Sequence, residues 1–399
     1  MNRKASWIFL LAALCALAAE CAMAGPISVG NLVVVQVGGT GADGTAGGAA
    51  LGGTAAPTYL KEFSTGGTQQ QTIALPTTAA GSGQRALTNQ GSATSEGFLS
   101  QSLNGSFLVL GGYNATTGAT APASDTAAVT NRVVGRVTIG SGAVDTSTSL
   151  ADAYDGSNIR SAFTADGTSI WTGGNGGSGA GASAGVKYTT FGASTSTRVN
   201  TGTGSGSNSR VVEIFGGQLY VSASSSPRLA IQQIGTGMPT VAGATETTLT
   251  GMPTSGTHSA YDYWFQNANT VFIADDGSVG SFGGIQKWTL SAGTWSLQYT
   301  IFNNGTTTTG VRGLTGVSGA GGVATLFATT TQSSANNLVS VLDPLTAAGA
   351  AAATPTVLAS APANTAFRGV EYINVPEPAS LALIGLAGLA LWGRARRSR

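Results

Sequence analysis

Short apolar segments recur through the middle of the chain, and glycine, asparagine or aspartate residues bound most of them. They form a repeat of about 50 to 60 residues, a period typical of propeller blades. Each unit begins with a charged residue and a short strand, followed by a turn and a strongly apolar strand. The first and second strands of the five internal units are predicted at 96–99 and 106–110, 160–163 and 169–171, 210–212 and 218–221, 262–265 and 270–273, and 312–314 and 324–327.

A third strand and usually a fourth follow in each unit, and four antiparallel strands make one blade. The two ends of this region complement each other. Residues 31–37, 59–63 and 71–75 match second, third and fourth strands without a first, and 368–372 match a first strand without successors. A blade shared between them would close the ring and remove an exposed sheet edge. The pattern therefore predicts an all-β, six-bladed β-propeller; seven blades or a pair of β-sandwiches are the alternatives.

The composition is consistent with this fold. Charged residues make up only 9% of the chain, against roughly 25% in typical soluble domains, and 60 glycines are present. Disorder is the competing interpretation of so much glycine, and the recurring apolar strands argue against it. The net charge is +1 and no Lys/Arg cluster occurs outside the two ends, which disfavours a nucleic-acid partner because binding phosphates requires a basic patch.

The first 24 residues have the order of a secretion signal. Arg3 and Lys4 precede an apolar run over 7–19, and small residues follow up to Ala24. This order predicts a signal peptide over 1–24, cleaved after Ala24. The exported body then spans 25–374, and residues 375–399 form a separate C-terminal segment.

The two cysteines, Cys15 and Cys21, both lie in this signal. A lipoprotein signal at Cys21 is the alternative, and Glu20 disfavours it because a small residue is wanted at that site. After cleavage the mature protein would contain no thiol.

The C-terminal segment contains Pro376, Glu377 and Pro378, then an apolar stretch over 381–392, then four arginines at 394, 396, 397 and 399. It resembles the PEP-CTERM sorting signal of Gram-negative bacteria, in which a Pro-Glu-Pro motif precedes a short hydrophobic helix and a terminal arginine cluster. The resemblance covers only this segment. It implies processing by an exosortase, a membrane transpeptidase-like enzyme, and a place in exopolysaccharide and biofilm systems.

General physical arguments agree with this resemblance. Arginines beyond an apolar segment stay on the cytoplasmic side, which leaves the body on the far side of the inner membrane. The apolar run is shorter than the roughly 20 residues of a full transmembrane helix. We therefore expect transient membrane anchoring through the C-terminal helix, then release to the cell surface or the extracellular space. A short permanent anchor is the alternative.

One charged position opens each repeat, and in a propeller the first strand of each blade lines the central channel. We therefore expect a ring of charged side chains near one channel mouth. A salt-bridged collar is one interpretation, because buried charges must be paired. The other is a binding site for a carboxylate, sulfate or uronic acid, because arginines outnumber acids and guanidinium groups bind such anions in a bidentate manner. The six positions are Glu96, Arg160, Arg210, Asp262, Arg312 and Arg368.

Signals for catalysis, metals or cofactors are weak. His258 is the single histidine, and no nucleophile-elbow motif accompanies it. The Asp-Gly pairs at 155–156 and 276–277 are more typical of turns than of calcium loops. The glycine-rich stretches 38–53 and 173–185 lack the ending of a phosphate-binding loop and are predicted to be surface loops. No cofactor and no metal are expected.

These features together predict an exported, non-enzymatic propeller that binds an acidic exopolysaccharide or a surface protein. An extracellular propeller enzyme acting on glycans, as a hydrolase or lyase, is the alternative, because paired carboxylates can come from distant blades. A self-assembling structural surface protein is a third possibility.

Overall fold

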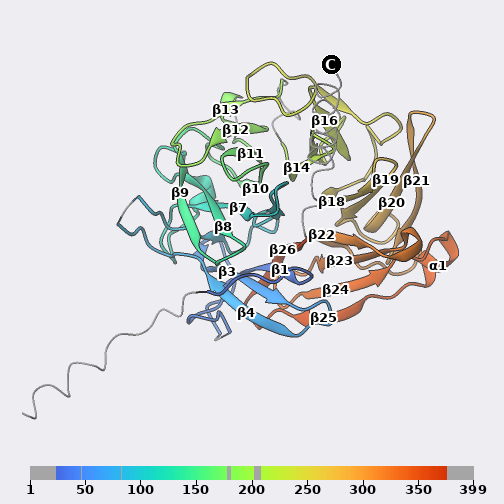
Figure 1. The fold of residues 1–399 in the computed structure, drawn as a ribbon, viewed down its shortest axis with the longest axis horizontal. Coiled ribbons are helices and arrows are strands. Elements are labelled where there is room, and N and C mark those ends of the chain that lie inside the picture. Colours follow the sequence, from blue (N-terminus) through green and yellow to red (C-terminus); the bar gives the residue numbers. More distant parts are fainter. Residues whose placement is uncertain (1–23, 46, 82, 178–180, 202–207, 375–399) are drawn as a thin grey trace, which may run out of the picture.

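The computed structural model describes residues 24–45, 47–81, 83–177, 181–201 and 208–374. Within these ranges the chain folds into six four-stranded antiparallel sheets arranged around a central axis, with a single short α-helix, α1 (Ala347–Ala352). Figure 1 shows the sheets following one another around a ring in sequence order. The predicted all-β, six-bladed β-propeller is confirmed.

Five blades are built from consecutive strands, with the first strand of each nearest the axis. Blade 2 contains β6 (Leu99–Gln101), β7 (Phe107–Tyr113), β8 (Arg132–Thr138) and β9 (Val144–Leu150). Blade 3 contains β10 (Ile159–Thr164), β11 (Ser169–Gly174), β12 (Lys187–Thr190) and β13 (Thr197–Arg198). Blade 4 contains β14 (Val212–Phe215), β15 (Gln218–Ser222), β16 (Ile231–Ile234) and β17 (Glu246–Thr248).

The remaining two consecutive blades follow the same order. Blade 5 contains β18 (Ala260–Asn267), β19 (Thr270–Asp275), β20 (Gly284–Ser291) and β21 (Thr294–Ile301). Blade 6 contains β22 (Val311–Ser318), β23 (Ala324–Thr330), β24 (Asn337–Leu342) and β25 (Thr356–Ser360). A small two-stranded sheet of β2 (Ala55–Ala56) and β5 (Asn89–Gln90) lies outside the blades.

Blade 1 joins the two ends of the body. Its strands are β26 (Ala366–Tyr372), β1 (Leu32–Val37), β3 (Thr58–Phe63) and β4 (Gln69–Ala74). The innermost strand thus comes from the C-terminal end, and β1 pairs with it antiparallel, with Val33 opposite Glu371 and Val37 opposite Ala366. The shared blade inferred from the sequence is therefore present.

Burial differs between the inner and outer strands of a blade. All residues of β1 and β10 are buried, because neighbouring blades cover both faces of these strands. The outermost strand β21 alternates between exposed and buried positions, as expected for a sheet edge with one face in water. Apolar packing between blades therefore holds the ring together.

The predicted signal peptide and the predicted C-terminal segment lie outside the described residues, and cleavage after Ala24 stays a prediction. Among the residues that the structure describes, no helix has both the length and the hydropathy needed to cross a membrane.

Candidate functional site

The central channel has two chemically different mouths. Residues at or just before the start of the inner strands form one, which we call the arginine mouth: Arg160, Arg210, Arg312 and Arg368. Residues further along the inner strands form the other, the carboxylate mouth: Glu213 and Glu371, each three residues after an arginine, together with Asp262.

Aromatic rings form the floor of the arginine mouth. The guanidinium carbon of Arg210 lies 3.6 Å from the ring centroid of Tyr261, and that of Arg312 lies 5.5 Å from it. The Tyr261 ring packs in turn against Phe98, with 5.8 Å between centroids. Both rings are buried. Arg210 and Arg312 therefore lie against a buried aromatic pair, which adds cation–π attraction.

Two of these arginines are buried with few acceptors. Arg160 donates from Nη1 to Asn208 Oδ1 at 2.5 Å and to the Ser209 carbonyl at 3.2 Å. Arg368 donates from Nη2 to the Gly91 carbonyl at 2.9 Å. Within the described ranges, the buried Nε atoms of Arg160, Arg210 and Arg368 have no hydrogen-bond partner. These arginines therefore retain unused donor capacity.

The same burial lowers the pKa values of Arg160 and Arg368. Burial lowers the pKa of Arg160 to about 10, and the nearby positive charge of Arg210 lowers it further. Burial also lowers the pKa of Arg368 to about 10; the Glu96 carboxylate opposes this shift and Arg312 adds to it. Like charges thus repel one another across this mouth.

Carboxyl groups compensate the four arginines only in part. Arg312 forms an ion pair with Asp276, at 3.1 Å between Nη2 and Oδ2, the single ion pair that these arginines make within the described part of the chain. Glu96 is fully buried and accepts hydrogen bonds from the Tyr113 hydroxyl, the Gln90 backbone N–H and the Asn158 side chain. Its carboxylate is therefore occupied by neutral donors and does not bind a guanidinium group directly.

Of the six positions expected to form a charged ring, the structure places five at this mouth. Glu96 and the four arginines come together, whereas Asp262 does not join them. The register of β18 against β19 shifts between Ala260 and Tyr263, and this bulge brings Tyr261 to the arginine mouth in place of Asp262. Asp262 instead accepts hydrogen bonds from the backbone N–H groups of Leu314 and Tyr263, each at 3.0 Å. A one-residue slip in a strand exchanges the two faces.

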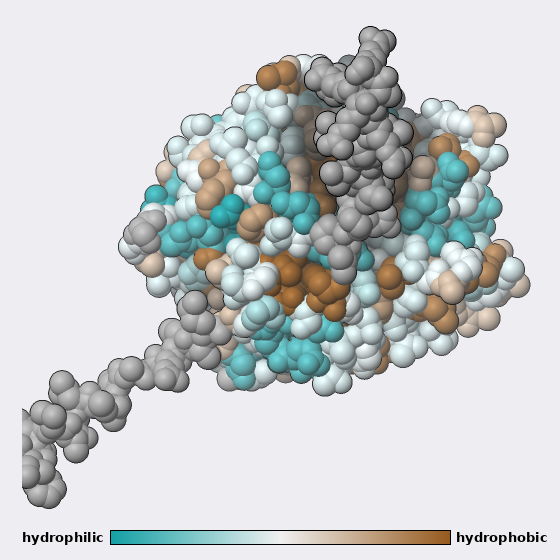
Figure 2. Space-filling model, in the orientation of Figure 1, coloured by the Kyte–Doolittle hydropathy of each residue, from teal (hydrophilic) through white to brown (hydrophobic). Residues whose placement is uncertain are grey.

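The carboxylate mouth opens into a cavity of about 490 Å³, a size typical of ligand pockets. Glu213 and Glu371 line it, and Leu103 and Asn374 also contribute. Four aromatic side chains from three inner strands complete the apolar part of its wall: Phe163, Phe215, Trp264 and Phe265. The face drawn in Figure 2 carries hydrophobic residues near its centre.

The acidic groups of this mouth are held in their protonated forms by burial. Burial raises the pKa of Asp262 to about 8. Burial and then repulsion from Asp262 raise that of Glu371 to about 8. The pKa of Glu213 is raised well above its usual value by burial and by both other carboxylates. Among the described residues none of the three is in an ion pair.

Sequence reasoning missed Glu213 and Glu371, although a signal was present. Each lies three residues after an arginine of the ring, in the sequences Arg210-Val-Val-Glu213 and Arg368-Gly-Val-Glu371. The same offset from Arg160 leads to Phe163, which also lines the cavity. A repeated Arg-x-x-Glu spacing at the start of inner strands therefore marks both mouths at once.

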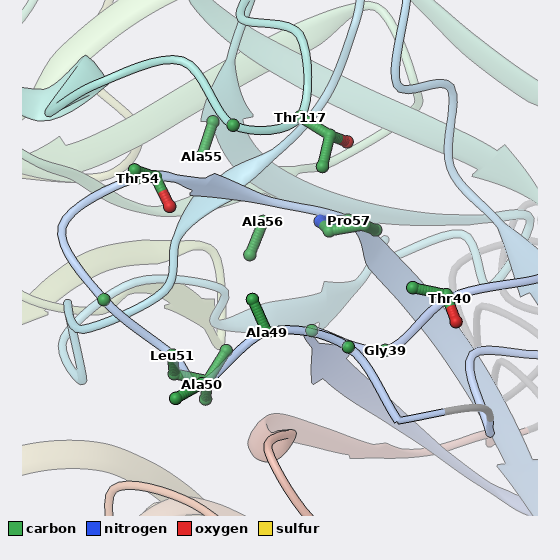
Figure 3. A pocket seen from close by; sticks show the side chains of 14 residues that line it. Gly39, Thr40, Ala49, Ala50, Leu51, Thr54, Ala55, Ala56, Pro57 and Thr117 are labelled. Atoms are coloured by element: carbon green, nitrogen blue, oxygen red, sulfur yellow. The ribbon is translucent and has the colours of Figure 1, made fainter.

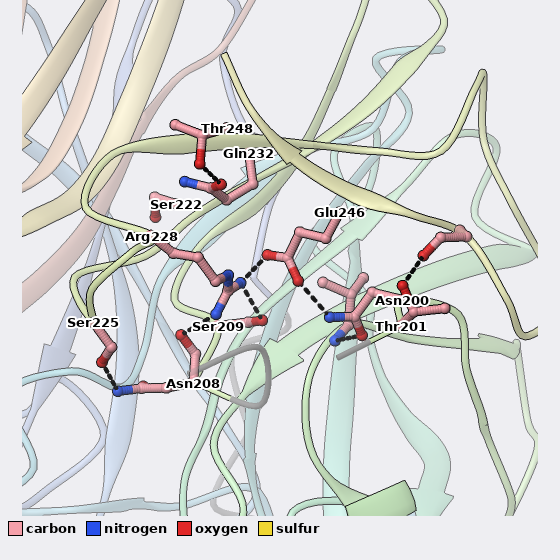
Figure 4. Close-up of polar contacts among 12 residues, drawn as sticks. Asn200, Thr201, Asn208, Ser209, Ser222, Ser225, Arg228, Gln232, Glu246 and Thr248 are labelled. Carbon is pink, nitrogen blue, oxygen red and sulfur yellow. Dashed lines mark hydrogen bonds and ion pairs between the residues drawn. The ribbon is translucent and has the colours of Figure 1, made fainter. Parts of the chain in front are cut away.

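Two further features lie outside the channel mouths, a small pocket and a buried ion pair. The predicted glycine-rich loop 38–53 borders a small pocket of about 140 Å³, lined by glycine, alanine and threonine residues together with Leu51 and Pro57, and by no charged group (Figure 3). Arg228 and Glu246 form a buried ion pair, and Glu246 also accepts from Asn200 Nδ2 at 2.8 Å (Figure 4). Because Asn200 follows β13, this network joins blades 3 and 4.

His258 is part of neither the arginine mouth nor the carboxylate mouth. Its ring stacks on Phe282 with 3.6 Å between centroids, and burial lowers its pKa. Over the described ranges, His, Cys, Asp and Glu side chains form no group of three placed to hold a metal ion.

Comparison with known proteins identifies the C-terminal segment. The family model described as the PEP-CTERM protein-sorting motif matches residues 374–399. The resemblance of this segment to PEP-CTERM sorting signals is thereby confirmed. The chain is a six-bladed β-propeller that carries a PEP-CTERM sorting motif, which implies export and processing by an exosortase. Among curated proteins, no significant match is found.

Solved structures show only a distant likeness. A provisionally assigned 6-phosphogluconolactonase from Bacteroides uniformis is 13% identical, with a TM-score of 0.42 and 83% of each chain covered. AztD from Citrobacter koseri is 8% identical, with a TM-score of 0.33, 78% of this chain and 68% of that chain covered. Because these TM-scores are low, the propeller assignment rests on the sheet topology alone.

Proposed function

We propose that this exported propeller binds an acidic polysaccharide at the arginine mouth and does not transform it. The observation that supports this most strongly is the convergence of four arginines from four blades, with one direct ion pair among them in the described structure. Carboxylate groups of uronic acids match the planar donor arrangement of guanidinium groups.

Accessibility favours Arg210 and Arg312 as the first contacts. Both are half-buried, whereas Arg160 and Arg368 are buried beneath. A carboxylate over the Tyr261 ring would reduce the repulsion between the guanidinium groups. The same ligand would supply an acceptor to the unpartnered Nε–H of Arg210.

The two acids at this mouth support a binding role and not catalysis, because both already have partners. Glu96 is enclosed by three donors, and Asp276 is paired with Arg312. Neither is positioned as a free general acid or base.

The test is titration of the purified protein with oligogalacturonate and, as a neutral control, with a glucose oligomer of equal length. We expect binding of the uronate that weakens as sodium chloride rises to about 0.5 M, because salt screens surface charge. Arg210→Gln and Arg312→Gln should each reduce affinity, and Arg85→Gln, a half-buried arginine outside the ring, should not. No uronate binding at low salt would contradict the proposal and favour a structural collar.

The location is tested separately by mass spectrometry of the native protein from membranes and from medium. A chain that starts near residue 25 and ends near the Pro376-Glu377-Pro378 motif would support release to the cell surface or matrix. An intact C-terminus at Arg399 in the membrane fraction would support a permanent anchor instead.

A further inference from the structure

The chain leaves the described body at the carboxylate mouth. Asn374, the last described residue, lines the cavity of about 490 Å³. Two hydrogen bonds with the Gln101 side chain hold it there. The Asn374 backbone N–H donates to Gln101 Oε1 at 2.9 Å, and Gln101 Nε2 donates to the Asn374 carbonyl at 3.0 Å. The C-terminal segment therefore starts from a fixed point on the wall of this cavity.

Apolar side chains from three inner strands form a large part of the cavity wall. Phe163 comes from β10, Phe215 from β14, and Trp264 and Phe265 from β18. Phe215 and Trp264 are only partly buried, and Leu103, which also lines the cavity, is 45% exposed. Exposed apolar surface gathered in one place is typical of an interaction site.

The two carboxyl groups on this wall carry no charge at neutral pH. Burial and then repulsion from Asp262 raise the pKa of Glu371 to about 8, and burial raises that of Glu213 well above its usual value. A protonated carboxyl group is far less costly to cover with apolar groups than an ionised one. The cavity is therefore suited to an uncharged, apolar occupant.

The chain itself supplies an occupant of this kind. Residues 381–392 contain leucine, alanine, isoleucine, glycine and one tryptophan, and no charged residue. Only the six residues 375–380 separate this stretch from Asn374, and they reach at most about 25 Å even when fully extended. The stretch is also shorter than the roughly 20 residues of a full transmembrane helix. A short connection of this kind presents the stretch to the cavity at a high effective concentration.

We propose that, whenever the C-terminal segment is outside a membrane, its apolar stretch 381–392 docks in the carboxylate mouth of its own propeller. The body then shields the apolar part of the sorting segment from water, and removal of the segment uncovers the cavity. This inference rests on the cavity and on the position of the sorting motif. Polysaccharide binding at the arginine mouth is not needed for it.

The test is disulfide cross-linking within one chain that spans residues 25–399. This part of the chain contains no cysteine, so an introduced pair of thiols gives no background. Leu103→Cys in the cavity wall is combined in turn with a second substitution in the apolar stretch: Ala382→Cys, Ala387→Cys or Ala390→Cys. The oxidant is copper phenanthroline, in buffer without detergent or lipid. We expect an intramolecular disulfide in at least one pair, because docking brings two Cα atoms within the roughly 7 Å that the bond requires.

A position at the other mouth serves as the first control. Val129 is 76% exposed and lies in the loop between β7 and β8. This loop begins after Tyr113, whose hydroxyl bonds to Glu96 at the arginine mouth. Val129→Cys in place of Leu103→Cys should give at least about tenfold less intramolecular product, because the docked stretch is held at the opposite end of the channel.

A second control separates docking from mere proximity. Leu386→Asp with Leu389→Asp keeps the connection to Asn374 but places charges in the apolar stretch, and should lower the yield at least about tenfold. Leu386→Met with Leu389→Met should retain it. Thermal unfolding confirms that the body of each variant is folded. Disulfides formed only between two chains, equal yields from Val129→Cys and Leu103→Cys, or a yield that Leu386→Asp with Leu389→Asp leaves unchanged would each overturn the proposal.

Discussion

Near the start of the inner strands the channel is lined by guanidinium groups, and further along the inner strands by carboxyl groups. Both sets are largely withdrawn from water. An arginine cannot lose its proton near neutral pH, so Arg160 and Arg368 remain charged and use carbonyl and amide oxygens as acceptors. A carboxyl group can be neutralised by taking up a proton, and the pKa of about 8 at Glu371 indicates that it does.

Removing a charged group from water therefore has two different outcomes here. A buried arginine keeps its charge, whereas a buried carboxyl group takes up a proton. At the arginine mouth charge persists, and the site is ready for an anion at any physiological pH. At the carboxylate mouth charge appears only when pH rises. The arginine mouth is therefore charged at every physiological pH, whereas the charge of the carboxylate mouth depends on pH.

The largest effect is expected outside both mouths, where a buried charge is fully paired. Glu246→Ala removes the partner of Arg228 and should lower the free energy of unfolding by about 3–5 kcal/mol, because an unpaired charge remains buried. Urea unfolding measures this. Thr248→Ala removes only a neutral hydrogen bond to Gln232 and should cost about 1 kcal/mol. Equal losses in the two variants would contradict the contrast between paired charge and neutral polar groups.

The next effect concerns how closely the inner strands approach at the arginine mouth. A Cβ atom at Gly369 would lie 2.5 Å from the Leu99 backbone nitrogen and 2.7 Å from the Gly97 carbonyl oxygen. Gly369→Ala should therefore destabilise the protein by about 1–3 kcal/mol through overpacking. Gly53→Ala is the control, since a Cβ there meets nothing within 4 Å. A neutral result at Gly369 would show that the strands can separate without cost.

A smaller effect distinguishes the mouths by pH. Carboxyl groups whose pKa is raised in the folded state bind protons more tightly when folded, so their contribution to stability is lost as pH rises. Since burial raises the pKa values of Asp262 and Glu371 from their ordinary values of 3.8 and 4.5 to about 8, the Tm should fall between about pH 4 and about pH 8. Glu371→Gln should reduce this fall by about 2–4 °C.

The arginines contribute no slope in that range, because the pKa values of Arg160 and Arg368 stay near 10. Burial also raises the pKa values of Glu96, Asp275 and Glu246, so the difference between the wild-type protein and Glu371→Gln, measured by differential scanning fluorimetry at several pH values, isolates the carboxylate mouth. An unchanged slope in Glu371→Gln would contradict the assignment of the pH effect to this mouth.

The smallest effect is expected for Arg210→Gln. The substitution removes hydrogen bonds to Ser259 and Ala260 but also removes repulsion toward Arg160 and Arg312. Stability should therefore change by no more than about 0.5 kcal/mol, as urea unfolding can show. A loss above about 2 kcal/mol would identify Arg210 as part of a structural collar.

The fold could be predicted because its local signals agree with one another. At the turn after β10, for example, Asp166 Oδ1 accepts from the backbone N–H groups of Thr168 and Ser169 at 2.8 Å, and Gly167 adopts a φ of +85°. Aspartate followed by glycine predicts this turn from sequence alone. The shortest outer strand, β13, carries only two residues and gives no comparable pattern.

The site could be predicted only in part, because its geometry depends on strand pairing. The position of Asp262 follows from a bulge in β18, which adds one residue against β19 and leaves no distinct signal in the sequence. The carboxylate mouth brings together Glu213 and Glu371, which are far apart in the chain and belong to blades 4 and 1. Only the three-dimensional ring places them in one cavity.

The shared blade has a consequence for the order of events during export. The closing strand β26 ends at Tyr372, and the sorting motif begins at residue 374. Until this last strand of the body is delivered, β1 has no inner partner and the ring stays open with an unpaired edge. The ring can therefore close only when almost the whole body is available. The strand that completes the propeller lies directly before the segment that carries the sorting motif.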